Sequence, residues 1–163
     1  MKIITLTLAA LLMASTDGRS QTDNLKTQKQ EKMNTKAITQ NILTKLENGW
    51  NNANGTEYAQ PFADTAEFVD IRGVLHQNST RQFLGEAHQG VFMGIYKDSK
   101  IEYSLTQVIP LNDNIIVANA KAALDAPSGP LAGKSASTIT MVIVKMDNTW
   151  QIRAFHNTLV AKQ

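Results

Sequence analysis

The chain has 163 residues, a formal net charge of +2, 42% hydrophobic residues and no cysteine. This length and apolar content fit one domain with its own core, and the absence of cysteine excludes disulfides, thiolate nucleophiles and sulfur-ligated metals. No basic patch alternates with aromatic residues, so the composition does not indicate nucleic-acid binding.

The N-terminus has the pattern of a signal peptide over residues 1–20. Lys2 gives a positive start, and residues 3–14 form an apolar run that is too short for a stable membrane anchor. We expect cleavage after Thr16 or Ser20, with Ser20 preferred, and an exported protein that is periplasmic or secreted; an uncleaved apolar tail is the alternative. Residues 21–35 are typical of a polar, solvated linker rather than a nucleic-acid arm, which leaves residues 36–163 as the folded domain.

The first helix of this domain is predicted to begin at Thr35 or Lys36 and to end near Asn52. Its apolar residues recur every four positions, at Ile38, Ile42, Leu46 and Trp50. Turn-forming residues at 51–55 end this helix. A short helix is expected over 56–60, because the residue before Pro61 avoids helical geometry.

A strand is predicted over residues 66–72, a turn over 73–79 and a helix over 80–96. In this helix Leu84, His88 and Phe92 are four residues apart, so an imidazole projects from an apolar stripe. Its glycines cost helix stability and hint at a close backbone approach to a neighbour.

Four long strands are predicted to follow, at residues 101–109, 115–124, 137–146 and 150–161. Asparagine and aspartate residues at 112–114 and 147–148 mark tight hairpin turns, and residues 125–134 form a longer loop. Helices followed by strands indicate an α+β domain, with about three helices on one face of a curved, mainly antiparallel sheet. Strands and helices do not alternate and no glycine-rich nucleotide motif is present, which excludes a doubly wound nucleotide-binding sheet.

This element order is similar to the nuclear transport factor 2-like cone, which ketosteroid isomerase and SnoaL-type polyketide cyclases share. Four segments narrow the resemblance to the SgcJ/EcaC-type subgroup: residues 49–55 (GWNNANG), 62–69 (FADTAEFV), 87–99 (AHQGVFMGIYKDS) and 150–158 (WQIRAFHNT). The resemblance covers roughly residues 37–159. It implies the fold, a conical pocket and often a homodimer formed through the sheet, and it implies chemistry only loosely.

His88 and His156 are the first candidate site residues. His156 shares a predicted strand face with Trp150, Ile152 and Ala154, which should turn toward the helices. We therefore expect both imidazoles to face one cavity, as lining residues or as acid–base groups near neutral pH. The alternative for His88 is a core histidine that bonds a backbone carbonyl or a carboxylate.

Asp70, the third candidate catalytic residue, shares a strand face with Phe68. A carboxylate among apolar groups has a raised pKa, which suits a general acid or base. The alternative is a surface carboxylate paired with Arg72. The cone aspartate of the isomerases and cyclases is not transferred to Asp70, since no motif places it at that position.

Aromatic residues would supply the apolar lining of a cavity, although most aromatic residues belong to the core. The candidate ligand-binding residues are Trp50, Tyr58, Phe68, Phe92, Tyr96, Tyr103 and Asn157. Asn157 is expected on the strand face opposite to His156, bonded to backbone at the sheet or at a subunit interface. The three histidines are too scattered to predict a metal site, and no cofactor is predicted.

Three functions are compatible with these residues. The first is an exported domain that binds a small apolar or carbonyl-containing molecule, with or without cofactor-free proton transfer. The second is a non-catalytic dimerisation or interaction module that uses the sheet. The third is an oxidoreductase, the label attached to the SgcJ/EcaC subgroup, which no nucleotide, haem or cysteine motif supports. Whether the protein is an enzyme stays open.

Overall fold

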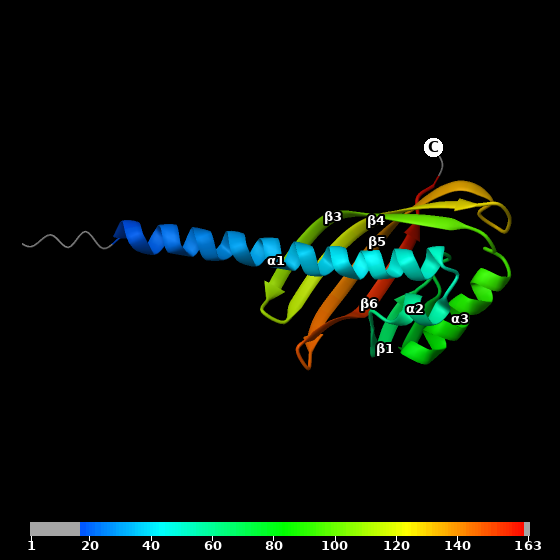
Figure 1. Ribbon diagram of the computed structural model, residues 1–163, viewed down its shortest axis with the longest axis horizontal. Helices are drawn as coiled ribbons and strands as arrows, with labels where there is room; N and C mark the ends of the chain where they lie inside the picture. Colours follow the sequence, from blue (N-terminus) through cyan, green and yellow to red (C-terminus); the bar gives the residue numbers. More distant parts are fainter. Residues whose placement is uncertain (1–16, 162–163) are drawn as a thin grey trace, which may run out of the picture. The chain divides into compact units, whose positions relative to one another are not determined.

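The computed structural model describes residues 17–161 (Figure 1). Its elements are α1 (Asp17–Asn51), α2 (Gly55–Ala59), β1 (Phe62–Val69), β2 (Leu75–Thr80), α3 (Arg81–Met93), β3 (Lys100–Asn112), β4 (Ile115–Ala126), β5 (Gly133–Met146) and β6 (Thr149–Leu159). The chain divides into two units, residues 1–31 and 32–163, and the described part of the first unit is helical. Residues 1–16, most of the predicted signal peptide, lie outside the described residues. None of the described helices is long and apolar enough to cross a membrane.

Within the second unit, the strands form one six-stranded sheet in the order β2-β1-β6-β5-β4-β3. β1 and β6 are parallel, and all other neighbouring strands are antiparallel. The sheet is curved, and α2, α3 and the C-terminal part of α1 lie on one face of it (Figure 1). This arrangement confirms the predicted α+β fold class.

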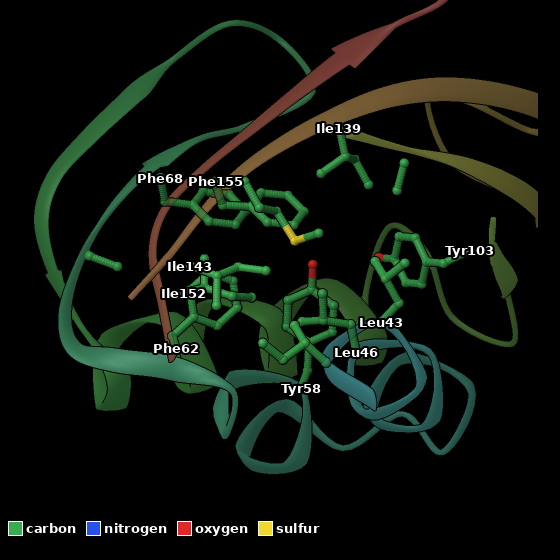
Figure 2. Close-up of a cluster of buried hydrophobic side chains, with 14 of the residues drawn as sticks. Leu43, Leu46, Tyr58, Phe62, Phe68, Tyr103, Ile139, Ile143, Ile152 and Phe155 are labelled. Carbon is green, nitrogen blue, oxygen red and sulfur yellow. The ribbon is translucent and has the colours of Figure 1, made fainter. Parts of the chain in front are cut away.

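The core lies between the helices and the inner face of the sheet (Figure 2). Large side chains with no more than 2% exposure come from all three helices and from β1, β4, β5 and β6, among them Leu43, Leu46, Tyr58, Phe62, Leu84, Ile116, Ile139, Met141, Ile143, Ile152 and Phe155. Burial of each such side chain stabilises the fold by about 1.5–3 kcal/mol. On β4 the inner face also carries small residues, Ala118, Ala120 and Ala122, so larger side chains of neighbouring elements fill the space there.

Side chains of α1 take the place of a further strand at the edge of the sheet. Asn51 Nδ2 donates to the carbonyl of Ile101 (2.9 Å), and the Ile101 N–H donates to Asn51 Oδ1 (2.8 Å). The Tyr103 N–H donates to Glu47 Oε2 (2.9 Å). Because β3 is an edge strand, these bonds satisfy backbone groups that would otherwise be unpaired, and they fix the end of α1 against the sheet.

Several predicted boundaries are wrong. The strand predicted over residues 66–72 is β1 and covers residues 62–69, so Asp70 lies just after it. The helix predicted over residues 80–96 ends at Met93. The first helix begins at Asp17, so residues 21–35 are helical; their role as a linker stays a prediction. Lysine, glutamine and glutamate extend a helix well without forming an apolar stripe, so periodicity does not detect this part of α1. Residues 75–79 were predicted as part of a turn and Thr80 as the start of a helix, but residues 75–80 form β2. The polar sequence of β2 lacks alternation because it lies at the sheet edge and is held by pairing with β1.

Candidate functional site

The helix that carries His88 begins at the predicted place. Thr80 is the N-cap of α3, and its side-chain oxygen accepts a hydrogen bond from the Phe83 N–H (3.1 Å). Leu84, His88 and Phe92 are all buried. The four-residue spacing therefore does place an imidazole inside the apolar stripe of this helix.

His88 is held in one tautomer. Its Nδ1 lies 2.8 Å from the carbonyl oxygen of Leu84, and since a carbonyl only accepts, Nδ1 carries the proton. Nε2 is then an acceptor, and it has no hydrogen-bond partner among the described residues. Four rings surround the imidazole, with centroid distances of 4.1 Å for Tyr58, 5.5 Å for Phe68, 6.1 Å for Phe92 and 6.5 Å for Trp50. Burial lowers the pKa of His88 to about 4, so the ring is neutral at pH 7.

Tyr58 and Tyr103 point into the core from α2 and β3 (Figure 2). Burial raises the pKa of Tyr58 to about 12 and that of Tyr103 well above its usual value. Both hydroxyl groups therefore keep their protons at neutral pH. These two candidate residues, like Phe68, belong to the buried core cluster.

The predicted orientation of His156 is wrong, because β6 contains a bulge. Val142 pairs with Ala154 whereas Ile143 pairs with Ile152, so Arg153 is an extra residue in the ladder. The extra residue reverses the alternation that follows it. His156 is exposed on the outer face, and the two candidate imidazoles do not face a common cavity.

The same bulge turns Asn157 to the inner face, whereas the sequence predicted that His156 would lie there. Asn157 lies directly opposite Ile139, which is fully buried. Its Oδ1 is buried and has no hydrogen-bond partner among the described residues. An unpaired buried acceptor of this kind costs about 1–3 kcal/mol.

Asp70 lies at the end of β1 as a paired carboxylate. It accepts hydrogen bonds from the Arg72 guanidinium (2.7 Å), from the backbone N–H groups of Arg72 and Val74, and from His76 Nε2 (3.4 Å). Partial burial acts to raise its pKa, but these bonds outweigh that effect and lower the pKa to about 2. The prediction of a raised pKa is therefore wrong, and the pairing with Arg72 that formed the alternative is present.

A cleft of about 340 Å³ lies between the end of α1, the end of α3 and the segment leading into β3. Three candidate ligand-binding residues, Trp50, Phe92 and Tyr96, line it. The Trp50 ring is 5.1 Å from that of Phe92 and 6.1 Å from that of Tyr96, measured between centroids. The wall is therefore aromatic, and the same Trp50 and Phe92 rings pack on His88 behind it.

Hydrogen bonds fix this wall in position. Trp50 Nε1 donates to Ser99 Oγ (3.0 Å), and Ser99 Oγ donates to the carbonyl of Tyr96 (2.7 Å). The remaining polar lining includes Asn51, Lys97, Asp98 and Lys100, none of which was a candidate from sequence. Residues 51–55 were predicted as a turn and residues 97–100 as a connection between elements. Asn51, Lys97 and Asp98 also lie in the resemblance segments 49–55 and 87–99, but nothing in those segments gave their side chains a role.

A second groove of about 570 Å³ lies beside the β4–β5 turn and the end of β6. Its lining is mainly apolar, with Leu131, Leu159 and Val160, and it includes one charged residue, Lys134. No candidate site residue lines this groove.

No protein-family model and no curated protein matches the chain. Solved structures do match it. A domain of unknown function with a cystatin-like fold from Nostoc punctiforme is 21% identical, with a TM-score of 0.69 and coverage of 78% of each chain. A nuclear transport factor 2-like protein of unknown function from Shewanella oneidensis is 14% identical, with a TM-score of 0.64 and coverage of 76% of this chain and 98% of that one. A ketosteroid isomerase-like protein from Erwinia carotovora atroseptica is 11% identical, with a TM-score of 0.63 and coverage of 77% and 96%.

These similarities show the fold: the domain has the α+β fold described as nuclear transport factor 2-like or cystatin-like. At such low identities they carry no further information about activity.

Proposed function

We propose that this domain binds a small, mainly apolar molecule in the cleft formed by Trp50, Phe92 and Tyr96. The observation that carries the proposal is the convergence of three aromatic rings, from three separate segments, on one cleft of about 340 Å³. Small-molecule sites have volumes of about 300–1,000 Å³ and walls that are mainly apolar with a few polar groups.

The aromatic wall is preorganised by hydrogen bonds within the protein. The hydrogen bonds from Trp50 to Ser99 and from Ser99 to the Tyr96 backbone hold the indole ring of Trp50 against the segment that carries Tyr96. A rigid aromatic surface binds a flat molecule with little loss of side-chain entropy, which favours affinity.

Binding, rather than catalysis, is the activity that the geometry favours. His156 faces outward and Asp70 is tied to Arg72, so the three candidate catalytic residues do not gather around one point. His88 keeps a free Nε2 lone pair, but its low pKa makes it a weak base. In addition, His88 is not among the residues that line the cleft, although Trp50 and Phe92 are.

The proposal includes the SgcJ/EcaC-type assignment and export through a cleaved signal peptide. The four sequence segments of the resemblance support the first, and Lys2 with the apolar run at 3–14 supports the second. Expression of the full chain in a bacterial host, followed by N-terminal sequencing of periplasmic protein, should give a mature chain that starts at residue 17 or 21. Full-length protein confined to the cytoplasm would refute export.

Thermal unfolding in the presence of 2-naphthol tests the binding proposal. A ligand that binds only the folded state raises the melting temperature by mass action. We expect a dose-dependent increase in melting temperature for the native chain and its loss in Met93→Trp. This variant places a bulky indole ring at the rim of the cleft, at a position that is 74% exposed. Leu111→Trp, at a position outside the cleft that is 60% exposed, is the matched control and should keep the increase. An increase that persists in Met93→Trp would contradict the proposed site.

Self-association through the sheet is a second candidate, because an apolar row crosses its outer face. Ile109, Val117 and Val142 lie side by side on three neighbouring strands, and Ile109 is 38% exposed. Next to this row, Thr140 Oγ1 donates to Asn119 Oδ1 (2.9 Å). We expect light scattering to report a dimer that Val142→Asp dissociates; a strict monomer at high concentration would remove this candidate.

A further inference from the structure

We infer that the molecule bound in the Trp50–Tyr96 cleft carries a negative charge, so that its class is a small aromatic carboxylate or a comparable flat anion. This inference rests on the proposed function, because it assigns the chemistry of the ligand in the same cleft.

The neutral polar groups of the cleft are already used. The indole N–H of Trp50 and the hydroxyl of Ser99 are engaged within the wall. The side-chain amide of Asn51 bonds both the N–H and the carbonyl of Ile101. A ligand therefore finds few free neutral donors or acceptors on these residues, and its polar contacts are left mainly to the charged side chains and the Tyr96 hydroxyl.

Those charges are mainly positive. Lys97 and Lys100 line the cleft, and Asp98 is the single carboxylate among its lining residues. Lys100 is held in place, because its Nζ donates to the carbonyl of Asn51 at 2.6 Å. An ammonium group has three N–H donors, so Lys100 retains two for a ligand.

The ends of two helices do not reverse this preference. α1 and α3 both end at the cleft, and a helix C-terminus carries partial negative charge that would favour a cation. Lys100 already neutralises the last turn of α1, and the N–H groups of Gly94 and Tyr96 both donate to the carbonyl of Val91 in α3. With these carbonyls occupied, the charged side chains decide the preference: Lys97 and Lys100 against Asp98 leave the lining with a formal net charge of +1.

A cationic ligand is the competing class, since aromatic faces attract ammonium groups. Two lysines at the same cleft oppose it by like-charge repulsion, and they stabilise a carboxylate by charge-assisted hydrogen bonds. The aromatic wall then stacks the flat part of an anionic ligand while the lysines hold its charged end.

The test uses Trp150→Phe, which leaves Trp50 as the single tryptophan and makes its fluorescence a reporter of the cleft. Benzoate, benzyl alcohol and benzylammonium share one ring and differ in charge, so each is titrated in turn. We expect benzoate to bind roughly tenfold more tightly than benzyl alcohol and benzylammonium to bind most weakly. Lys97→Gln and Lys100→Gln should reduce benzoate binding toward that of benzyl alcohol, whereas Lys145→Gln, a lysine outside the cleft, should not.

The outcomes separate the two proposals. Equal binding of all three probes, or tightest binding of benzylammonium, would overturn the anionic class and leave the binding site in place. No response of Trp50 to any probe, in protein whose circular dichroism shows it folded, would overturn the site and the ligand class together.

Discussion

The imidazole of His88 stacks on the ring of Tyr58, with centroids 4.1 Å apart and planes inclined by 29°. This contact is possible because α2 and α3 approach closely: a side chain at Gly55 would collide with the Gly85 carbonyl, and Gln89 Oε1 accepts a bond from the Gly55 N–H (2.9 Å). Glycine at the contact thus places one helix near enough to the other for the two rings to stack. His88 is consequently a buried, neutral group at the back of the aromatic wall.

Acid should destabilise the protein through His88. The folded state lowers the pKa of His88 from 6.5 to about 4, so the unfolded chain binds more protons between these values. Stability should fall as the pH drops from about 6.5 to about 4, by up to about 3 kcal/mol from this residue. Urea unfolding across this range measures the effect in the native chain and in His88→Phe, which lacks the titrating group. Equal pH slopes in the two proteins would contradict the burial of a neutral imidazole.

Asp70→Asn should weaken the fold in a pH-dependent way. The pKa of Asp70 is lowered to about 2, so the stabilisation from its bonds is fully present above its unfolded value of 3.8 and is lost as the pH falls through about 2. We expect the variant to melt at a lower temperature than the native chain at pH 7 and at nearly the same temperature near pH 2. A constant difference at both pH values would show that the charge of Asp70 is not what stabilises the turn.

Removal of the Asn51 amide should loosen the edge of the sheet. Asn51→Ala leaves the N–H and the carbonyl of Ile101 without their partners, which should cost about 1–3 kcal/mol. Chemical denaturation measures this loss. Asn52→Ala is the matched control, since its exposed bond to Glu57 is expected to contribute much less. Similar losses in the two variants would argue against the role of Asn51 as a substitute strand.

The β4–β5 turn provides a comparison between two glycines. Gly129 and Gly133 both have positive φ angles, +90° and +87°, so alanine at either position should cost about 1 kcal/mol of backbone energy. A side chain at Gly129 would also collide with the carbonyl of Ile95, whereas one at Gly133 meets nothing within 4 Å. Gly129→Ala should therefore lower the melting temperature more than Gly133→Ala. Equal effects of the two substitutions would mean that the turn does not pack closely against Ile95 at Gly129.

Local spacing was sufficient to predict the arrangement of α3 and of the hairpins. Leu84, His88 and Phe92 share one face because the helical repeat requires it, whatever the helix packs on. The orientation of His156 could not be predicted in this way. A single extra residue, Arg153, reverses which residues of β6 face inward after it. This bulge is set by the pairing of β6 with β5, and the sequence of β6 alone does not predict it.

Only some of the residues that line the cleft could be predicted from the sequence, because the others are placed there by contacts between distant parts of the chain. Trp50, Phe92 and Tyr96 were candidates because they are aromatic residues near apolar stripes. Lys97 lies in the connection after α3 and Lys100 is the first residue of β3. Their positions at the cleft depend on tertiary contacts, such as the bond from Lys100 to Asn51 across 49 residues. Long-range contacts of this kind leave no periodic signal.

The most direct test of the central claim, that the aromatic cleft is the binding site, is the indole N–H spectrum of ¹⁵N-labelled protein during titration with 2-naphthol. The chain has two tryptophans, and only Trp50 lines the cleft, so its indole signal should shift in a saturable manner while that of Trp150 stays in place. A shift of the Trp150 signal with an unchanged Trp50 signal, or backbone amide shifts in the same labelled protein confined to the groove at Leu131 and Val160, would contradict the account.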